Sequence, residues 1–178
     1  MSETRSSGAA LPTSPEALHA RLEELGIAYK AVSHPPVFTV EEAKALRGEL
    51  PGAHIKNLFL RNKKGRMWLV TCLEDREVDL KDLGARLEAG RFSFGSAERL
   101  MTYLGVEPGS VTPFAVVNDG GGAVTMVLDA GVMAAEAVNC HPLVNTMTTA
   151  VAPGDRIRFI EAEGPDPKRM DLREPPGA

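Results

Sequence analysis

The strongest constraint on the fold is the apolar stretch at residues 54–60 (HIKNLFL), which predicts a buried strand with two polar residues in its middle. Side chains alternate between the two faces of a strand, so Asn57 shares one face with Ile55 and Phe59, and Lys56 lies on the other. Desolvating an ammonium group is costly unless something pairs with it. Two interpretations fit. Lys56 either extends its amino group to water, or it points into a pocket and binds an oxygen-rich ligand.

This strand begins a predicted antiparallel hairpin. Residues 55–61 lead through the turn Asn-Lys-Lys-Gly into a second apolar segment, 67–73. A second hairpin is predicted from residues 114–117 and 124–128, which a glycine-rich turn connects. The alternation of polar and apolar residues predicts further short strands at 29–33, 91–94, 138–141 and 145–151.

Helix starts are marked by residues that cap the first free backbone N–H groups. Such N-caps are Ser14, Thr39, Asp79 and Ser96, and a last helix is predicted from Pro153. Helices interspersed with hairpins indicate an α+β fold, not a regular βαβ repeat. The predicted organisation is a flexible N-terminal lead (1–13), one domain (14–162) and a flexible C-terminal tail (163–178).

Composition narrows the possible functions. The net charge of −4 argues against a protein that coats nucleic acid, although a local basic patch remains compatible with docking one particular nucleic acid. No apolar run reaches transmembrane length and no signal pattern begins the chain, so we expect a cytoplasmic protein. Cys72 and Cys140 are expected to be buried small residues, and the four histidines lack metal-ligand spacing, so no metal or cofactor is predicted.

Two nucleophilic chemistries are poorly supported. Ser110 follows a Pro-Gly turn but lacks the second glycine of a serine-hydrolase elbow. Cys140 and His141 are adjacent in a predicted strand and therefore point to opposite faces, so the imidazole cannot easily deprotonate the thiol. What remains is a lysine in a buried strand, a glycine-bearing loop and a polar run at 139–149, which together suit a pocket for an acyl group.

Three runs of residues resemble one known family, the YbaK/prolyl-tRNA synthetase-associated editing domains. They are HIKNLFL at 54–60, LGVEPGSVTPF at 104–114 and HPLVN at 141–145, and the resemblance covers residues 14–162. It is strongest for the freestanding branch that deacylates mischarged Ala-tRNA(Pro). The resemblance implies a single α+β domain with a curved, mixed, barrel-like sheet surrounded by helices. It also implies an aminoacyl-tRNA hydrolase, that is, a carboxylic ester hydrolase.

The resemblance further implies which residues form the site. The family's essential lysine falls on Lys56. The implied substrate-binding residues are Val37, Phe38, Thr39, Asn57, Gly109, Ser110, His141 and Asn145. The implied partners are the acceptor end of mischarged tRNA(Pro) and, transiently, prolyl-tRNA synthetase, with no membrane or DNA partner.

A mechanism follows as a hypothesis. Water attacks the ester carbonyl, Lys56 steadies the developing oxyanion, and backbone amides of the Gly109–Ser110 loop assist as an oxyanion hole. The ribose hydroxyl or the substrate ammonium helps the water, because no protein base is evident. Two alternatives remain open: a deacylase for Cys-tRNA(Pro) or another small amino acid, and a non-catalytic module that binds aminoacyl-tRNA or a free amino acid.

Overall fold

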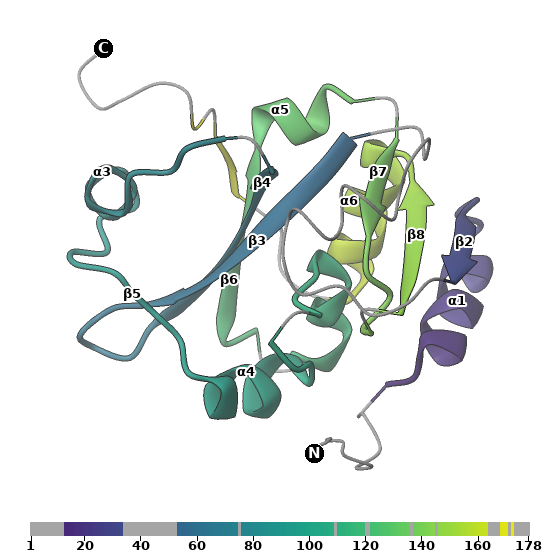
Figure 1. The fold of residues 1–178 in the computed structure, drawn as a ribbon, viewed down its shortest axis with the longest axis horizontal. Helices are drawn as coiled ribbons and strands as arrows, with labels where there is room; N and C mark the ends of the chain where they lie inside the picture. Colours follow the sequence, from purple (N-terminus) through teal and green to yellow (C-terminus); the bar gives the residue numbers. More distant parts are fainter. Residues whose placement is uncertain are drawn as a thin grey trace.

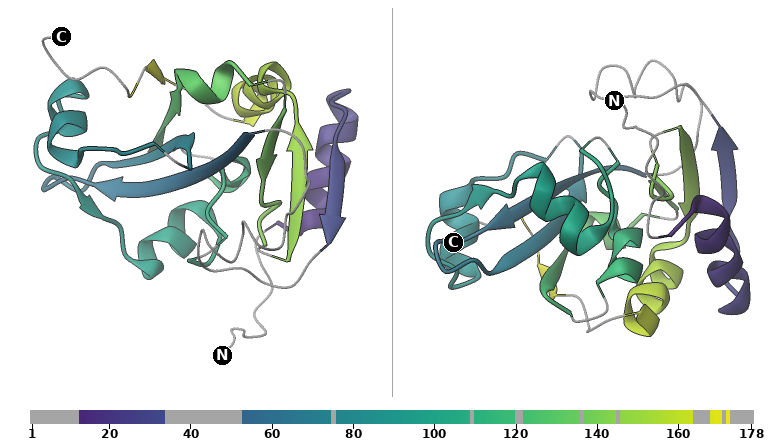
Figure 2. Two further views of the ribbon diagram at one scale, coloured as in Figure 1. Left: turned by 45° about the horizontal axis from the view of Figure 1, so that its top comes forward. Right: turned by 90° about the horizontal axis from the view of Figure 1, so that it is seen from below.

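The computed structural model describes residues 13–33, 53–74, 76–108, 110–119, 122–135, 137–144, 146–163, 168–170 and 172. Within these ranges, one mixed sheet of eight strands runs in the order β2-β8-β7-β3-β4-β6-β9, and β5 pairs with β3 off this path. Figures 1 and 2 show β3 as the long strand that connects the two halves of the sheet. The predicted α+β fold class is therefore confirmed. The strands are β2 (Lys30–Ser33), β3 (Ala53–Arg61), β4 (Met67–Leu73), β5 (Ser93–Phe94), β6 (Val124–Asp129), β7 (Val138–Cys140), β8 (Met147–Val151) and β9 (Lys168–Met170).

The first predicted hairpin is confirmed. β3 and β4 pair in an antiparallel register that runs without interruption from Ile55 opposite Leu73 to Arg61 opposite Met67. The side chain of Asn62 builds the turn, since its Oδ1 accepts the backbone N–H groups of Lys64 and Arg66 at 3.1 and 2.9 Å. The turn is therefore fixed by local hydrogen bonds of the kind that asparagine favours.

The second predicted hairpin is wrong. Residues Pro113–Asn118 form a 3-10 helix, η1, and β6 pairs in parallel with β4. Pro113 is suited to the first helical position, and the hydroxyl of Thr112 accepts the N–H of Phe114 at 3.3 Å. These local signals favour a helical turn over the strand that the apolar run suggested.

The C-terminal segment also differs from the prediction. Residues 168–170, expected to belong to a flexible tail, form β9 and pair in parallel with β6. Beyond β9, the N–H of Leu172 donates to Oδ1 of Asp129 at 3.1 Å. A short polar segment of this kind carries little periodicity, so its pairing depends on a partner far away in the sequence.

The helices begin where their caps predicted. The side chain of Ser14 accepts the N–H of Ala17, Asp79 accepts those of Lys81 and Asp82, and Ser96 accepts that of Arg99. The capping box predicted at Thr39 lies outside the described residues. The helices are α1 (Pro15–Glu24), α3 (Leu80–Arg86), α4 (Ala97–Leu104), α5 (Ala130–Met133) and α6 (Pro153–Glu163).

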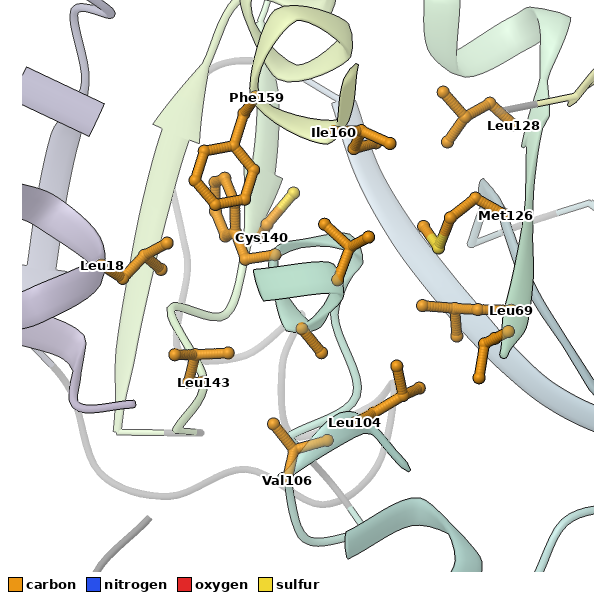
Figure 3. Packing of buried hydrophobic residues seen from close by; sticks show 14 of the residues in the cluster. Leu18, Leu69, Leu104, Val106, Met126, Leu128, Cys140, Leu143, Phe159 and Ile160 are labelled. Atoms are coloured by element: carbon orange, nitrogen blue, oxygen red, sulfur yellow. The ribbon is translucent and has the colours of Figure 1, made fainter. Parts of the chain in front are cut away.

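Two hydrophobic clusters lie on opposite faces of the sheet. The first face carries the larger cluster, where Leu69 and Met126 from one half of the sheet meet Cys140 from the other half and Phe159 of α6 (Figure 3). The second face carries a smaller cluster between the β3–β4–β6 strands and α3, which includes Leu60. Cys72 and Cys140 are buried, as expected. Among the described residues, no helix is long and apolar enough to cross a membrane.

A glycine in α3 is needed for close packing. A Cβ atom on Gly84 would collide with the carbonyl group of Gly90, whereas one on Gly154 in α6 would meet nothing within 4 Å. We expect Gly84→Ala to lower the free energy of unfolding by about 1–3 kcal/mol, despite the better helix propensity of alanine. Gly154→Ala is the matched control and should be neutral or stabilising by up to about 1 kcal/mol. Urea denaturation measures both, and equal effects of the two substitutions would contradict this packing.

Candidate functional site

Strand β3 changes its partner on one edge, and the change leaves a gap. On that edge its start pairs with β7 at Ala53 and His54, and its end pairs with β5 at Leu60 and Arg61. On the opposite edge, β4 pairs along the whole of 55–61. Residues 55–58 therefore have a strand partner on one side only among the described strands. Backbone groups at such an edge are available to a ligand or a covering loop.

Lys56 lies in this gap on the second face. Its position on β3 faces Cys72 on β4, and the side chain of Lys56 is half-buried. It makes no hydrogen bond or ion pair with any residue that the structure describes. Burial raises the pKa of the Cys72 thiol to about 11, although the nearby charge of Lys56 acts in the opposite direction. The thiol is therefore protonated at neutral pH and supplies neither a nucleophile nor a counter-ion for the lysine.

Asn57 lies on the first face, as the alternation predicted, and its amide connects the sheet to a loop. Oδ1 accepts the hydroxyl of Thr71 on β4 at 2.6 Å, and Nδ2 donates to the carbonyl of Val111 at 3.0 Å. Both polar ends of the side chain thus bind protein groups. Asn57 holds the loop that follows α4 on the first face of the sheet, and no bulge in the strand is needed.

Ser110 in this loop is buried, and its backbone amide takes part in a turn. Its N–H donates to the carbonyl of Glu107 at 3.0 Å and closes a turn. The Ser110 amide therefore already has a partner within the protein, and the predicted role of the Gly109–Ser110 amides in an oxyanion hole stays a prediction, because Gly109 lies outside the described residues. No described residue forms a hydrogen bond with the Ser110 hydroxyl.

His141 follows β7 and is held by the segment that leads into β8. Its Nδ1 lies 3.1 Å from the carbonyl oxygen of Met147. A carbonyl only accepts hydrogen bonds, so Nδ1 carries a proton, and in the neutral ring Nε2 is the acceptor. In the parallel register, His54 is opposite Asn139. His141 and Lys56 each lie two residues beyond this pair in the sequence, His141 just after the end of β7 and Lys56 within β3.

The remaining predicted site residues cannot be placed. Val37, Phe38, Thr39, Gly109 and Asn145 lie outside the described residues. The fold also brings to the site three groups of side chains that were not predicted from the sequence. These are Thr71, which binds Asn57; the largely buried Asn139 beside His54; and the ion pair of Arg76 with the buried Asp129, at 3.1 Å.

The sequence contains one signal for Thr71: it is a polar residue in the apolar strand 67–73, and the predicted hairpin register sets it opposite Asn57. The Arg76–Asp129 pair has no such signal, because 53 residues separate its members.

The chain matches the model of the aminoacyl-tRNA editing domain over residues 34–159. It is 36% identical over 158 residues to "Prolyl-tRNA editing protein ProX" of Acetoanaerobium sticklandii, covering 88% of this chain and 96% of the relative. It is 40% identical over 155 residues to "Prolyl-tRNA synthetase associated domain-containing protein 1" of Mus musculus, covering 84% and 91%. A solved structure described as a candidate trans-editing enzyme for prolyl tRNA synthetase has a TM-score of 0.70 at 22% identity, covering 93% of this chain and 99% of that one.

The α+β fold and these relatives together define the class. The protein belongs to the aminoacyl-tRNA editing domain family. The family resemblance inferred from the three sequence motifs is thereby confirmed.

The hydrogen bond between Thr71 and Asn57 can be tested by a substitution of similar shape. Thr71→Val removes the hydroxyl of the buried Thr71 and leaves Oδ1 of the half-buried Asn57 without this donor, so the free energy of unfolding should fall by about 1–3 kcal/mol. Thr125→Val on β6 is the control, since Thr125 forms no hydrogen bond with a described side chain; its effect should stay within about 0.5 kcal/mol. Chemical denaturation of both variants decides the matter, and a Thr71→Val protein as stable as the control would refute the bridge.

Proposed function

We propose that the protein is a trans-editing deacylase, which hydrolyses the ester bond between alanine and tRNA(Pro). The observation that carries the proposal is the half-buried Lys56, which lies at the open edge of β3 and has no counter-ion among the described residues. An ammonium in this position suits a ligand rich in oxygen atoms, such as the acylated 3′ end of an RNA. The names of the relatives, which refer to prolyl-tRNA, indicate that this RNA is a tRNA.

Physical chemistry explains why such an activity is useful. A synthetase pocket that accepts proline cannot exclude the smaller alanine by size, and a missing methylene in an apolar pocket discriminates by only about 1–3 kcal/mol. A second site that admits alanine and excludes proline supplies the missing selectivity. A transient encounter with prolyl-tRNA synthetase would present the mischarged product to this site.

In the proposed mechanism, water attacks the ester carbonyl and the ribose oxygen leaves, which gives free alanine and a deacylated tRNA. Lys56 orients the acceptor end and stabilises the negative charge on the carbonyl oxygen. We assign the second donor to the hydroxyl of Ser110, because its backbone N–H is already used by Glu107. A hydroxyl of the ribose or the ammonium of the substrate positions the water by a hydrogen bond, and the proton that the water loses passes to the leaving ribose oxygen.

The other residues shape the pocket in this proposal. His141, whose ring is held through Nδ1 by the carbonyl of Met147, contributes to the wall of the pocket. Asn57 acts through the loop that it binds at Val111. Val37, Phe38, Thr39, Gly109 and Asn145 complete the pocket by resemblance to the family.

Removal of the proposed oxyanion contact should abolish most of the activity. Lys56→Ala is expected to lower kcat for Ala-tRNA(Pro) by about 10²–10³-fold, which is the usual effect of removing one oxyanion donor. Lys30→Ala, at an exposed lysine of the edge strand β2, is the control and should leave the rate unchanged. Release of labelled alanine from tRNA(Pro) is the measurement. Near wild-type turnover in Lys56→Ala would rule out this mechanism.

The acyl specificity needs a separate comparison. Hydrolysis of Ala-, Cys-, Ser- and Pro-tRNA(Pro) by the wild-type protein should be fastest for alanine, and the proline ester should persist because the pocket excludes the larger ring. Faster release of cysteine or serine would assign the enzyme to another small amino acid. Binding of all four without release of any amino acid would mean a non-catalytic module.

A further inference from the structure

The end of the open β3 edge carries an exposed aromatic side chain. Phe94 on β5 is 62% exposed, compared with 41% for Val32 and 37% for Met101, the other exposed large hydrophobic residues that the structure describes. β5 pairs with β3, where Phe94 is opposite Leu60. The phenyl ring therefore lies beside the strand that carries Lys56. A single exposed apolar residue is ordinary, and the inference therefore depends on the charges around it.

The β3–β4 turn close to β5 is positively charged, although two exposed acidic residues, Glu88 and Glu98, lie on either side of β5 in the sequence. Residues 61–66 contain four basic and no acidic side chains, although the whole chain has 24 acidic and 20 basic residues. Lys63, Lys64 and Arg66 are exposed, and Arg91, shortly before β5, is exposed as well. Figure 2 shows that this end of the β3–β4 hairpin lies opposite the end formed by α1 and β2. We call Phe94 with Lys63, Lys64 and Arg66 the β5 surface.

Aromatic and basic side chains together suit a nucleic acid. Bases stack on exposed aromatic rings, and lysine and arginine bind the phosphates of the same strand. A second copy of this chain would bring two positively charged ends together, which is unfavourable. The run of cations next to Phe94 thus favours RNA over self-association.

The spacing along β3 fits the acceptor end of a tRNA. Lys56 and Leu60 are four residues apart on one extended strand, which corresponds to about 13 Å. A nucleic-acid strand covers that distance with roughly four nucleotides. When the acylated 3′ end is at Lys56, the point where the unpaired 3′ segment meets the acceptor stem lies beside Phe94.

We infer that Phe94 stacks on a nucleobase at this junction, and that Lys63 and Lys64 bind the adjoining phosphates. This inference rests on the proposed function, because the path of the RNA starts at Lys56. It assigns a docking role to a surface that lies outside the acyl pocket. Phe94 and the lysines then determine how tightly the tRNA binds, whereas Lys56 determines how fast the ester is cleaved.

The test compares a full substrate with one that lacks the stem. For Ala-tRNA(Pro), Phe94→Ala should lower kcat/KM by about 5–100-fold, mainly through KM, as expected for the loss of one stacked base. Phe94→Trp should retain most of the wild-type value. With 3′-O-alanyl-adenosine, which cannot reach β5, all variants should match the wild type. Val32→Ala, at an exposed residue of β2, is the control for loss of surface hydrophobicity.

The lysines are tested by salt dependence. The double variant Lys63→Gln/Lys64→Gln should bind uncharged tRNA(Pro) more weakly, and the slope of log K against log salt should be shallower by about 1.4–1.8. Lys30→Gln/Lys81→Gln, at exposed lysines elsewhere, should leave the slope unchanged. Fluorescence anisotropy with labelled tRNA gives both values.

The outcomes separate this inference from the proposed function. If the wild type binds uncharged tRNA but cleaves no ester, the proposed function fails, and a weaker affinity of Phe94→Ala still supports the β5 surface. If Phe94→Ala binds and cleaves within about twofold of the wild type, the stacking role is overturned whatever the activity on minimal substrates. A loss that extends equally to 3′-O-alanyl-adenosine would also overturn it, because it would show damage to the pocket.

Discussion

The structure depends on the way in which β3 is shared between the two halves of the sheet. β3 pairs with β4 along one edge, and on the other edge it pairs first with β7 in parallel and then with β5 in antiparallel fashion. Among the described strands, none pairs with the middle of β3 on this second edge. Lys56 and Asn57, the two polar residues in the middle of the strand, lie in that opening, and a polar or charged side chain is costly to bury without a partner.

Lys56 and Asn57 differ in how their polar groups are satisfied. Asn57 is satisfied inside the protein by Thr71 and Val111, and it joins the loop to the sheet. Lys56 points to the other face, where α3 covers the part of the sheet further along β3. Two adjacent residues of one strand therefore have different roles. Asn57 holds the loop in place, and Lys56 provides a charged group. Alternation of side chains makes this possible without distortion of the ladder.

Local signals explain what could be predicted from the sequence. The caps at Ser14, Asp79 and Ser96 and the turn at Asn62 depend on neighbours within four residues, and all are found in the structure. The parallel pairing of β4 with β6, and of β6 with β9, depends on residues that are far apart, and periodicity does not encode such partners. The same limit applies to the site. Lys56 and Asn57 follow from one motif, whereas the turn that occupies the Ser110 amide and the Arg76–Asp129 pair follow only from the fold.

The charges beside Lys56 explain why we assign it to a ligand. Cys72 opposite Lys56 stays protonated, since burial raises its pKa to about 11. The charge of Asp129 acts on the Cys72 thiol, but this carboxylate already binds Arg76 and the N–H of Leu172. No described carboxylate therefore neutralises the ammonium, although the group is half-buried. A half-buried ammonium group without a counter-ion does not stabilise the fold. In our proposal, the partner of Lys56 is an anionic oxygen of the substrate. This oxygen is present only when the ester is bound and attacked, which accounts for the position of Lys56.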